Sequence, residues 1–172
     1  MTRRRSPLGW LFLSILILFL DQLSKYLVTQ SLQLHEILVL IPGINLSLVH
    51  NTGAAFSFLR DAGGWQRWFF VALGAVVGTV VVIWLSRIER DRHWLLPCSL
   101  SLVLGGAAGN LVDRLVHGYV VDFIDVYYSG WHWPTFNVAD SAISVGAVLL
   151  VIDAIWLDRA QVSTHRADSG GS

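Results

Sequence analysis

Residues 135–156, TFNVADSAISVGAVLLVIDAIW, form an apolar run long enough to cross a bilayer as a helix, yet Asp140 lies near its start. An ionised carboxylate is costly at membrane depth. One interpretation needs no function: Asn137 caps the helix N-terminus, and Asp140 accepts hydrogen bonds from the unpaired N–H groups there. The other interpretation is that Asp140 takes part in a chemical reaction. This stretch alone leaves both interpretations open.

The composition of the whole chain is that of a membrane protein. Of its 172 residues, 54% are hydrophobic and 14% are charged, whereas about 25% charged is usual in a soluble domain. We predict an α-helical integral membrane protein with four transmembrane helices, at about residues 8–28, 66–86, 94–113 and 138–157. Residues 1–160 are expected to form a single membrane-embedded domain, followed by a disordered cytoplasmic tail at 161–172.

The distribution of arginine predicts the orientation. With four spans, eight arginines fall on the side of the two termini and three on the other side. Because basic residues are retained on the cytoplasmic side, we predict that both termini are cytoplasmic. We expect the first helix to be kept and not cleaved as a signal peptide, since no small-residue cleavage site follows it. Cys98, the one cysteine, excludes an intrachain disulfide.

Two connections on the outer side have sequence patterns that predict structure. Between the first two helices, a Pro-Gly turn separates two apolar runs, and Ile44, Leu46 and Leu48 alternate with polar residues. This pattern predicts strand, turn and strand. Before the fourth helix, residues 117–137 are rich in aromatic side chains such as Trp131, which are typical of the bilayer interface.

Polar residues inside apolar segments are the most informative ones. Asp21 and Lys25 are four residues apart, so we expect a structural ion pair on one helix face. Asp113 and Arg114 are adjacent, point in different directions on a helix and therefore pair elsewhere. Arg114 is a candidate for orienting a carboxylate.

Asp122 and Asp125 lie three residues apart in the apolar stretch YVVDFIDVYY. They occupy opposite faces if the stretch is extended and one face if it is helical. Two carboxylates that share a partly dry site cannot both ionise cheaply, so one acts as an acid and the other as a base. Such a pair can hydrolyse a peptide with an activated water. A proton or ion pathway would use the same residues.

Other chemistries lack their motifs. His35 and Glu36 begin a zinc-helix pattern that no later histidine completes, and the remaining histidines lack metal-ligand spacing. There is no nucleophile elbow and no phosphate-binding loop. We therefore expect no metal and no cofactor. The chain has no basic patch, so nucleic-acid binding is not expected either.

Five blocks together resemble lipoprotein signal peptidases, the bacterial signal peptidase II family of aspartyl proteases. They are DQLSKY, HNTGAAFSF, GGAAGNLVDRL, GYVVDFIDVY and WPTFNVADSAI, in the order and spacing of that family. The resemblance implies that Asp122 and Asp140 are the catalytic pair. It also implies supporting or substrate-binding roles for Asn51, Asn110, Arg114, Asn137, Ala139, Asp21, Lys25 and Asp113.

The same resemblance implies a substrate and a location. The substrate would be a prolipoprotein that carries diacylglyceryl on a cysteine and is cleaved on the N-terminal side of that cysteine. The enzyme would lie in the bacterial cytoplasmic membrane, in contact with membrane lipid, with its site near the outer face. The family also implies a small β-cradle between the first two helices and a short extramembrane helix or loop before the fourth, which would cover the site. We expect a monomer.

Two functions of other classes remain as alternatives. A proton- or ion-coupled transporter would use Asp21, Asp122, Asp140 and Asp153 as a relay and would spread its acids through the membrane depth. A non-catalytic assembly protein would tolerate replacement of the outer acids by amides. The clustering of most acids near the outer side favours the peptidase.

Overall fold

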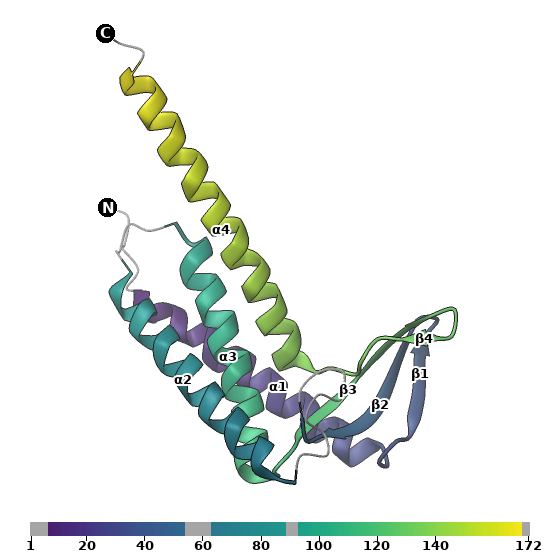
Figure 1. The fold of residues 1–172 in the computed structure, drawn as a ribbon. Helices are drawn as coiled ribbons and strands as arrows, with labels where there is room; N and C mark the ends of the chain where they lie inside the picture. Colours follow the sequence, from purple (N-terminus) through teal and green to yellow (C-terminus); the bar gives the residue numbers. More distant parts are fainter. Residues whose placement is uncertain (1–6, 54–62, 89–92, 170–172) are drawn as a thin grey trace.

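The computed structural model describes residues 7–53, 63–88 and 93–169. In chain order they form a short 3-10 helix η1 (Pro7–Trp10), α1 (Leu11–Ser31), β1 (Ile37–Ile41), β2 (Ile44–Asn51), α2 (Trp65–Arg87), α3 (Leu95–Val116), β3 (Val120–Tyr128), β4 (Trp131–His132) and α4 (Val138–Ser169). The helices form a bundle, and the strands form a small sheet that projects from one end of it (Figure 1).

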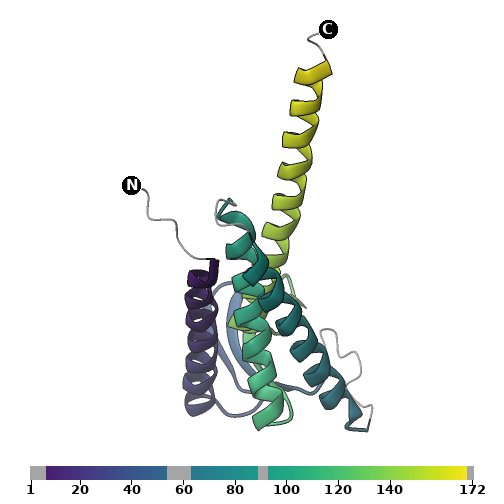
Figure 2. The same ribbon diagram turned by 90° about the vertical axis from the view of Figure 1, so that its left-hand side faces the viewer.

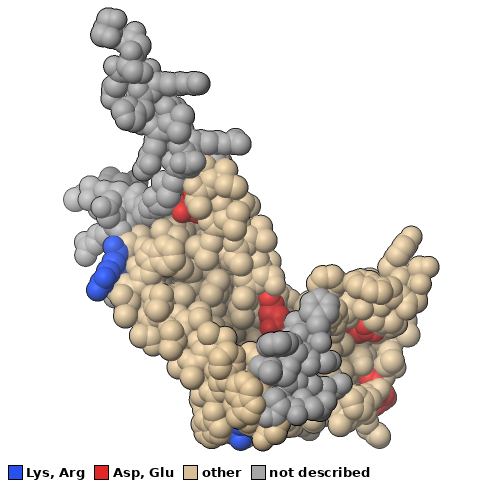
Figure 3. All heavy atoms as spheres, in the orientation of Figure 1, with Lys and Arg blue, Asp and Glu red and all other residues tan. Residues whose placement is uncertain are grey.

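All four helices are long and apolar enough to cross a membrane. Mean hydropathy is 1.8 in α1, 2.4 in α2 and 1.6 in α3, and it is 2.0 over residues Val138–Ile155 of α4. Figure 3 shows one face on which the helices carry very few charged side chains. The predicted four-helix membrane protein is therefore confirmed.

Helix α3 is the centre of the bundle and packs against the other three helices. Figure 2 shows it between α1 and α2. Small residues make the approach close: a side chain at Gly106 would collide with the backbone of Ala139 in α4. On the other side of α3, the Ser14 hydroxyl of α1 donates to the Ser101 carbonyl oxygen at 2.9 Å. Close backbone contact fixes how the acids on these helices face one another.

The sheet is antiparallel with the order β1-β2-β3-β4. The strand–turn–strand prediction for the first outer connection is confirmed by β1 and β2, whose turn contains Gly43 at a φ of 92°. An apolar cluster fixes the sheet to the end of α1 and contains Val28, Leu32, Leu48, Val121 and Phe123. Strand β3, which carries Asp122, is thereby held at the end of the bundle.

Of the short helix or loop expected before the fourth transmembrane helix, the helical form is not present and that part of the prediction was wrong. Residues 117–137 contain β3 and β4 and no helix. Ser129 and Gly130 have φ values of 50° and 81°, as in the two-residue turns that match the twist of a hairpin. The aromatic residues on either side pair as strands, with Tyr127 opposite His132.

The first turn of α1 and the far end of α4 lie at the end of the bundle away from the sheet (Figure 1). This arrangement agrees with an even number of spans, and the side of the membrane on which the termini lie stays a prediction. Helix α4 continues to Ser169, into residues 161–172 for which the sequence favours a disordered tail. The disorder of that tail also stays a prediction.

Candidate active site

Asp122 and Asp140 line one pocket, although they come from different elements. The pocket has a volume of about 610 Å³ and is bounded by α3, α4, β2, β3 and residues 133–136. Its other polar walls are Asn51, Asn110, Arg114, Thr135, Ser141 and Ser144, and its apolar walls include Val120, Trp133, Pro134, Phe136, Ile143 and Val145. A mostly apolar pocket with a few converging polar groups is the usual form of a ligand-binding or active site.

Asp140 occupies the first turn of α4 and takes part in the predicted cap. Its backbone N–H donates to Asn137 Oδ1 at 2.9 Å, and the Asn137 N–H donates back to Asp140 Oδ2 at 3.3 Å. This reciprocal pair is a capping box built from asparagine and aspartate. Asn110 Nδ2 donates to the other carboxylate oxygen at 2.8 Å. Capping therefore fixes the carboxylate and leaves it on the wall of the pocket.

Asp122 is held by two carboxamides. Asn51 Nδ2 donates to its Oδ2 at 2.9 Å, and Asn137 Nδ2 donates to its Oδ1 at 2.8 Å. Burial, followed by the nearby charge of Asp140, raises the pKa of Asp122 to about 7, while these hydrogen bonds and the charge of Lys25 partly oppose the rise. Asp122 is thus a carboxylic acid that exchanges its proton near neutral pH.

Asn137 connects the two acids. It is fully buried, and its amide nitrogen lies within hydrogen-bond distance of Asp122, of the Val121 carbonyl oxygen and of Asn110 Oδ1. Since Asn110 also binds Asp140, a continuous amide bridge runs from one carboxylate to the other. The bridge fixes the separation of the acids without neutralising either charge.

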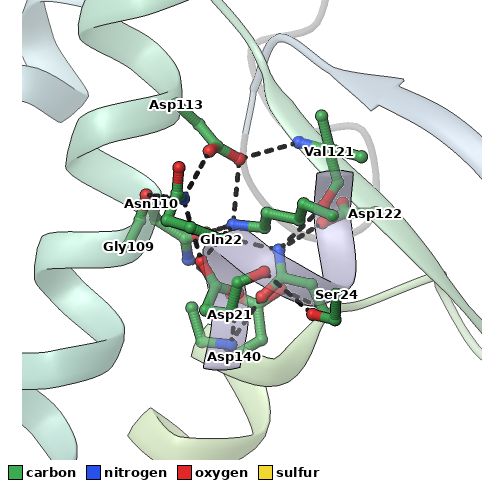
Figure 4. A network of polar contacts seen from close by, with 12 residues as sticks. Asp21, Gln22, Ser24, Gly109, Asn110, Asp113, Val121, Asp122 and Asp140 are labelled. Carbon is green, nitrogen blue, oxygen red and sulfur yellow. Dashed lines mark hydrogen bonds and ion pairs between the residues drawn. The ribbon is translucent and has the colours of Figure 1, made fainter. Parts of the chain in front are cut away.

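A buried ionic cluster lies behind the pair (Figure 4). Lys25 Nζ lies 2.7 Å from Asp21 Oδ2 and 2.9 Å from Asp113 Oδ2, and at most 4% of each of these side chains is exposed. The predicted Asp21–Lys25 pair is confirmed, and Asp113 does pair away from Arg114. Each aspartate also binds one backbone N–H: Asp21 accepts from Ala139 at 2.9 Å, and Asp113 accepts from Val121 at 3.0 Å.

Those two backbone bonds are directly beside the acids of the pocket. Ala139 precedes Asp140, and Val121 precedes Asp122. The ionic cluster therefore fixes the backbone next to both acids, while the amide bridge fixes their side chains. Gly109 makes room for this arrangement, because a side chain there would collide with the Asp21 carboxylate.

Gln22 belongs to the same cluster and was missed by sequence reasoning. Its Nε2 lies 2.8 Å from Asp113 Oδ1, 3.2 Å from Asp21 Oδ2 and 3.3 Å from the Gly109 carbonyl oxygen. The available signal was a polar residue inside a membrane helix, next to Asp21. The family resemblance implies that the segment before the fourth helix covers the site, and residues 133–136 of that segment do line the pocket.

Arg114 lines the pocket but binds backbone oxygens. Its guanidinium donates to Gly53 at 3.1 Å and to Asn110 at 3.4 Å, and it lies 4.8 Å from the centre of the Phe70 ring. Among the described residues it has no hydrogen bond to a carboxylate, so direct orientation of an acid is not seen. It ties the end of β2 to α3 and adds positive charge to the pocket.

Asp125 is separated from the pocket by the strand itself. Residues Val120–Tyr128 are extended, which places Asp122 and Asp125 on opposite faces of β3. Asp125 instead binds Asn45 and His132. Of the two geometries that the sequence left open, the extended one is present, and Asp140 is the acid that joins Asp122. Among the described residues, no group of three or more His, Cys, Asp or Glu side chains is arranged to hold a metal ion.

Comparison with known proteins gives a consistent result. The profile of the family described as signal peptidase (SPase) II matches residues 13–156. The lipoprotein signal peptidase of Hydrogenovibrio crunogenus is 52% identical over 146 residues, which cover 85% of this chain and 84% of that protein. The lipoprotein signal peptidase of Alteromonas mediterranea is 51% identical over 150 residues, which cover 87% of this chain and 82% of that protein.

Solved structures are similar as well. A bacterial membrane enzyme determined by the in meso method superimposes with a TM-score of 0.78 at 28% identity, covering 89% of this chain and 90% of that one. A second structure with that description has a TM-score of 0.74 at 27% identity and covers 85% and 92% of the two chains. The family profile spans all four transmembrane helices and the whole sheet.

Proposed function

This chain belongs to the signal peptidase II family and removes signal peptides from prolipoproteins, and we propose that Asp122 and Asp140 are its catalytic pair. One observation carries the assignment: two acids from separate elements line one pocket and are joined through Asn110 and Asn137. Bringing two carboxylates together in a buried site costs free energy. Helix capping alone would not require the second acid.

The pair would work as general base and general acid. The ionised member takes a proton from a water molecule, whose oxygen forms a bond to the carbonyl carbon of the scissile peptide. The protonated member gives its proton to the carbonyl oxygen, which produces a tetrahedral diol. The carbon–nitrogen bond then breaks, the leaving amine takes a proton from one member of the pair, and one hydroxyl proton of the diol returns to the other member. The oxygen of the water stays on the new carboxyl group, and the pair again holds one proton. A member that titrates near neutral pH suits this exchange.

The surrounding residues would support the pair in three ways. Asn51, Asn110 and Asn137 orient the carboxylates by hydrogen bonds. The cluster of Asp21, Lys25 and Asp113 positions the backbone at Ala139 and Val121. Arg114 holds the end of β2 and provides a positive charge beside the two acids.

We further propose that the prolipoprotein substrate carries diacylglyceryl on the cysteine that follows the cleaved bond. The pocket lies where α3 ends and α4 begins, and its apolar walls Ile143 and Val145 belong to the membrane-spanning part of α4. A lipid chain attached to the cysteine can then stay in the bilayer while the peptide bond reaches the acids. This placement requires no removal of the lipid from the membrane.

We further propose that the protein is a monomer in the bacterial cytoplasmic membrane. Both termini would be cytoplasmic, on the side that holds eight of the eleven arginines. The sheet and the pocket would then lie at the outer face. Labelling of single cysteines placed in β1 and near residue 88, from each side of the membrane, tests this orientation.

The catalytic assignment is tested by cleavage of a diacylglyceryl-modified prolipoprotein by the purified protein, followed as a gel shift. Asp122→Asn and Asp140→Asn should each abolish cleavage while the protein still folds in detergent. Glu36→Gln is the matched control, because Glu36 is an exposed acid that binds only the nearby Gln33 N–H among the described residues. Normal cleavage by either aspartate variant would contradict the assignment.

A further inference from the structure

A second buried polar cluster lies on the face of β3 opposite Asp122. Asp125 is 4% exposed, and its two carboxylate oxygens lie 2.8 and 3.0 Å from Nδ1 of His132 in β4. Asn45 in β2 donates to Asp125 Oδ2 at 2.8 Å. Three strands therefore meet at one carboxylate, and none of the three side chains lines the pocket.

The orientation of the Asn45 amide indicates that the Asp125 carboxylate is the common acceptor of the cluster. Asn45 is 5% exposed, and its Oδ1 has no hydrogen-bond partner in the described structure. A buried acceptor without a partner is unfavourable. The amide nevertheless presents its N–H group to Asp125, as expected if Asp125 is an acceptor that needs two donors at this position.

The cluster fixes a strand that has little else to hold it. Strand β4 is two residues long and pairs with β3 only through Tyr127–His132 and Tyr128–Trp131. Directly after His132, residues 133–136 form one of the walls of the pocket. Their backbone meets β3 at Trp133, whose N–H donates to the Val126 carbonyl oxygen at 2.8 Å, and at Phe136, which pairs with Ile124.

We propose that Asp125 and His132 are positioning residues that hold residues 133–136 against β3 and so set the affinity for the prolipoprotein substrate. This inference rests on the proposed function of the pocket. His132 marks the start of the wall and Asn137 its end, and Asn137 is fixed independently by the amide bridge. Loosening the His132 end therefore changes the shape of the wall and leaves the two catalytic carboxylates in place.

The test separates the two nitrogens of the histidine ring. An asparagine side chain carries its amide nitrogen near the position of Nδ1, whereas a glutamine carries it near the position of Nε2. His132→Asn should therefore keep the bond to Asp125, and His132→Gln should lose it. We expect His132→Gln and His132→Ala to raise KM about tenfold, at the lower end of the effect of losing one charge-assisted hydrogen bond, with kcat within about twofold of the parent. His132→Asn should restore KM.

Melting temperatures of all variants in detergent identify a folding defect, which is expected to be small because half of the His132 side chain is exposed. A double-mutant cycle gives a second measurement: adding His132→Ala to Asp125→Ala should raise KM no further than Asp125→Ala does alone. An unchanged KM in His132→Gln, a fall in kcat equal to the loss in kcat/KM, or additive effects in the cycle would each overturn the proposal. Asp122→Asn tests the proposed function separately, so the two can fail independently.

Discussion

Asp122 and Asp125 are two aspartates of the same strand, three residues apart and almost equally buried, with 2% and 4% of their surface exposed. On one face, Asp122 meets neutral amides and the like charge of Asp140. On the other face, Asp125 meets a histidine and an amide. Burial is the same, so the partners decide what each acid can do.

The comparison separates two uses of a buried carboxylate. An acid whose neighbours do not neutralise it keeps a proton that it can exchange, which is the requirement for general acid–base chemistry. An acid that is paired with a basic side chain serves as a fixed acceptor and holds structure together. If this difference holds, substitutions on the two faces of β3 should have different effects.

The largest effect is expected from amide replacement on the two faces. Asp122→Asn removes the exchangeable proton and should lower kcat by about 10³-fold or more. Asp125→Asn removes a charge on the far face and should act on KM instead. Steady-state cleavage of lipidated prolipoprotein measures both. A comparable loss of kcat in the two variants would remove the distinction between the faces.

The ionic cluster behind Asp122 should be next in size. Lys25→Met leaves Asp21 and Asp113 buried without their shared cation, and breaking a buried pair in this way costs about 3–5 kcal/mol. We expect a much lower melting temperature in detergent and loss of activity. Removing one of the stranded charges as well, in Lys25→Met with Asp113→Asn, should recover part of the stability. No recovery would show that the cluster is not held by charge.

Asn137 binds Asp122 on one face of β3 and Asn45 binds Asp125 on the other, so replacing each by alanine compares the two faces. Asn137→Ala removes the bridge and the helix cap together and should lower kcat by about 10- to 100-fold and stability by about 1–2 kcal/mol. Asn45→Ala removes one hydrogen bond to Asp125 and should change KM by only a few fold. Kinetics and thermal unfolding of both variants check the contrast, which fails if Asn45 proves the more damaging site for kcat.

A further prediction concerns pH. The pKa of Asp122 is raised from 3.8 to about 7, so the folded protein holds this proton more firmly than the unfolded chain does. Stability from this group is therefore complete below about pH 4 and is lost as the pH rises toward about 7. Melting temperature against pH should show this fall in the parent and in Asp125→Asn, and a flatter curve in Asp122→Asn. The kcat should also decline above about pH 7.

Local spacing predicted several contacts that the structure contains. The four-residue interval between Asp21 and Lys25 gave their ion pair, and the three-residue interval between Asn137 and Asp140 gave the cap. These could be predicted because helix geometry alone determines which side chains meet. The pairing of Asp122 with Asp140 came from the family resemblance, since no local rule brings a strand and a distant helix together.

The errors and omissions have physical reasons too. The resemblance led to an expected helix before α4, although the Ser129-Gly130 pair between aromatic residues is a hairpin signal. Gln22 and the two partners of Asp125 depend on how helices and strands pack, which a sequence does not show. The faces of β3 were left open for the same reason, because extended and helical backbones place the same residues differently.

The hydrogen bond from the Ala139 N–H to Asp21 joins the first membrane helix to the last one. It has a consequence for synthesis of the protein. When only three helices have entered the membrane, the chain already contains Asp122 but has neither Asp140 nor the amide bridge through Asn137. On the proposed catalytic assignment, the nascent enzyme cannot cleave a substrate until its fourth helix is made and has docked, so proteolytic activity would begin only with the complete fold.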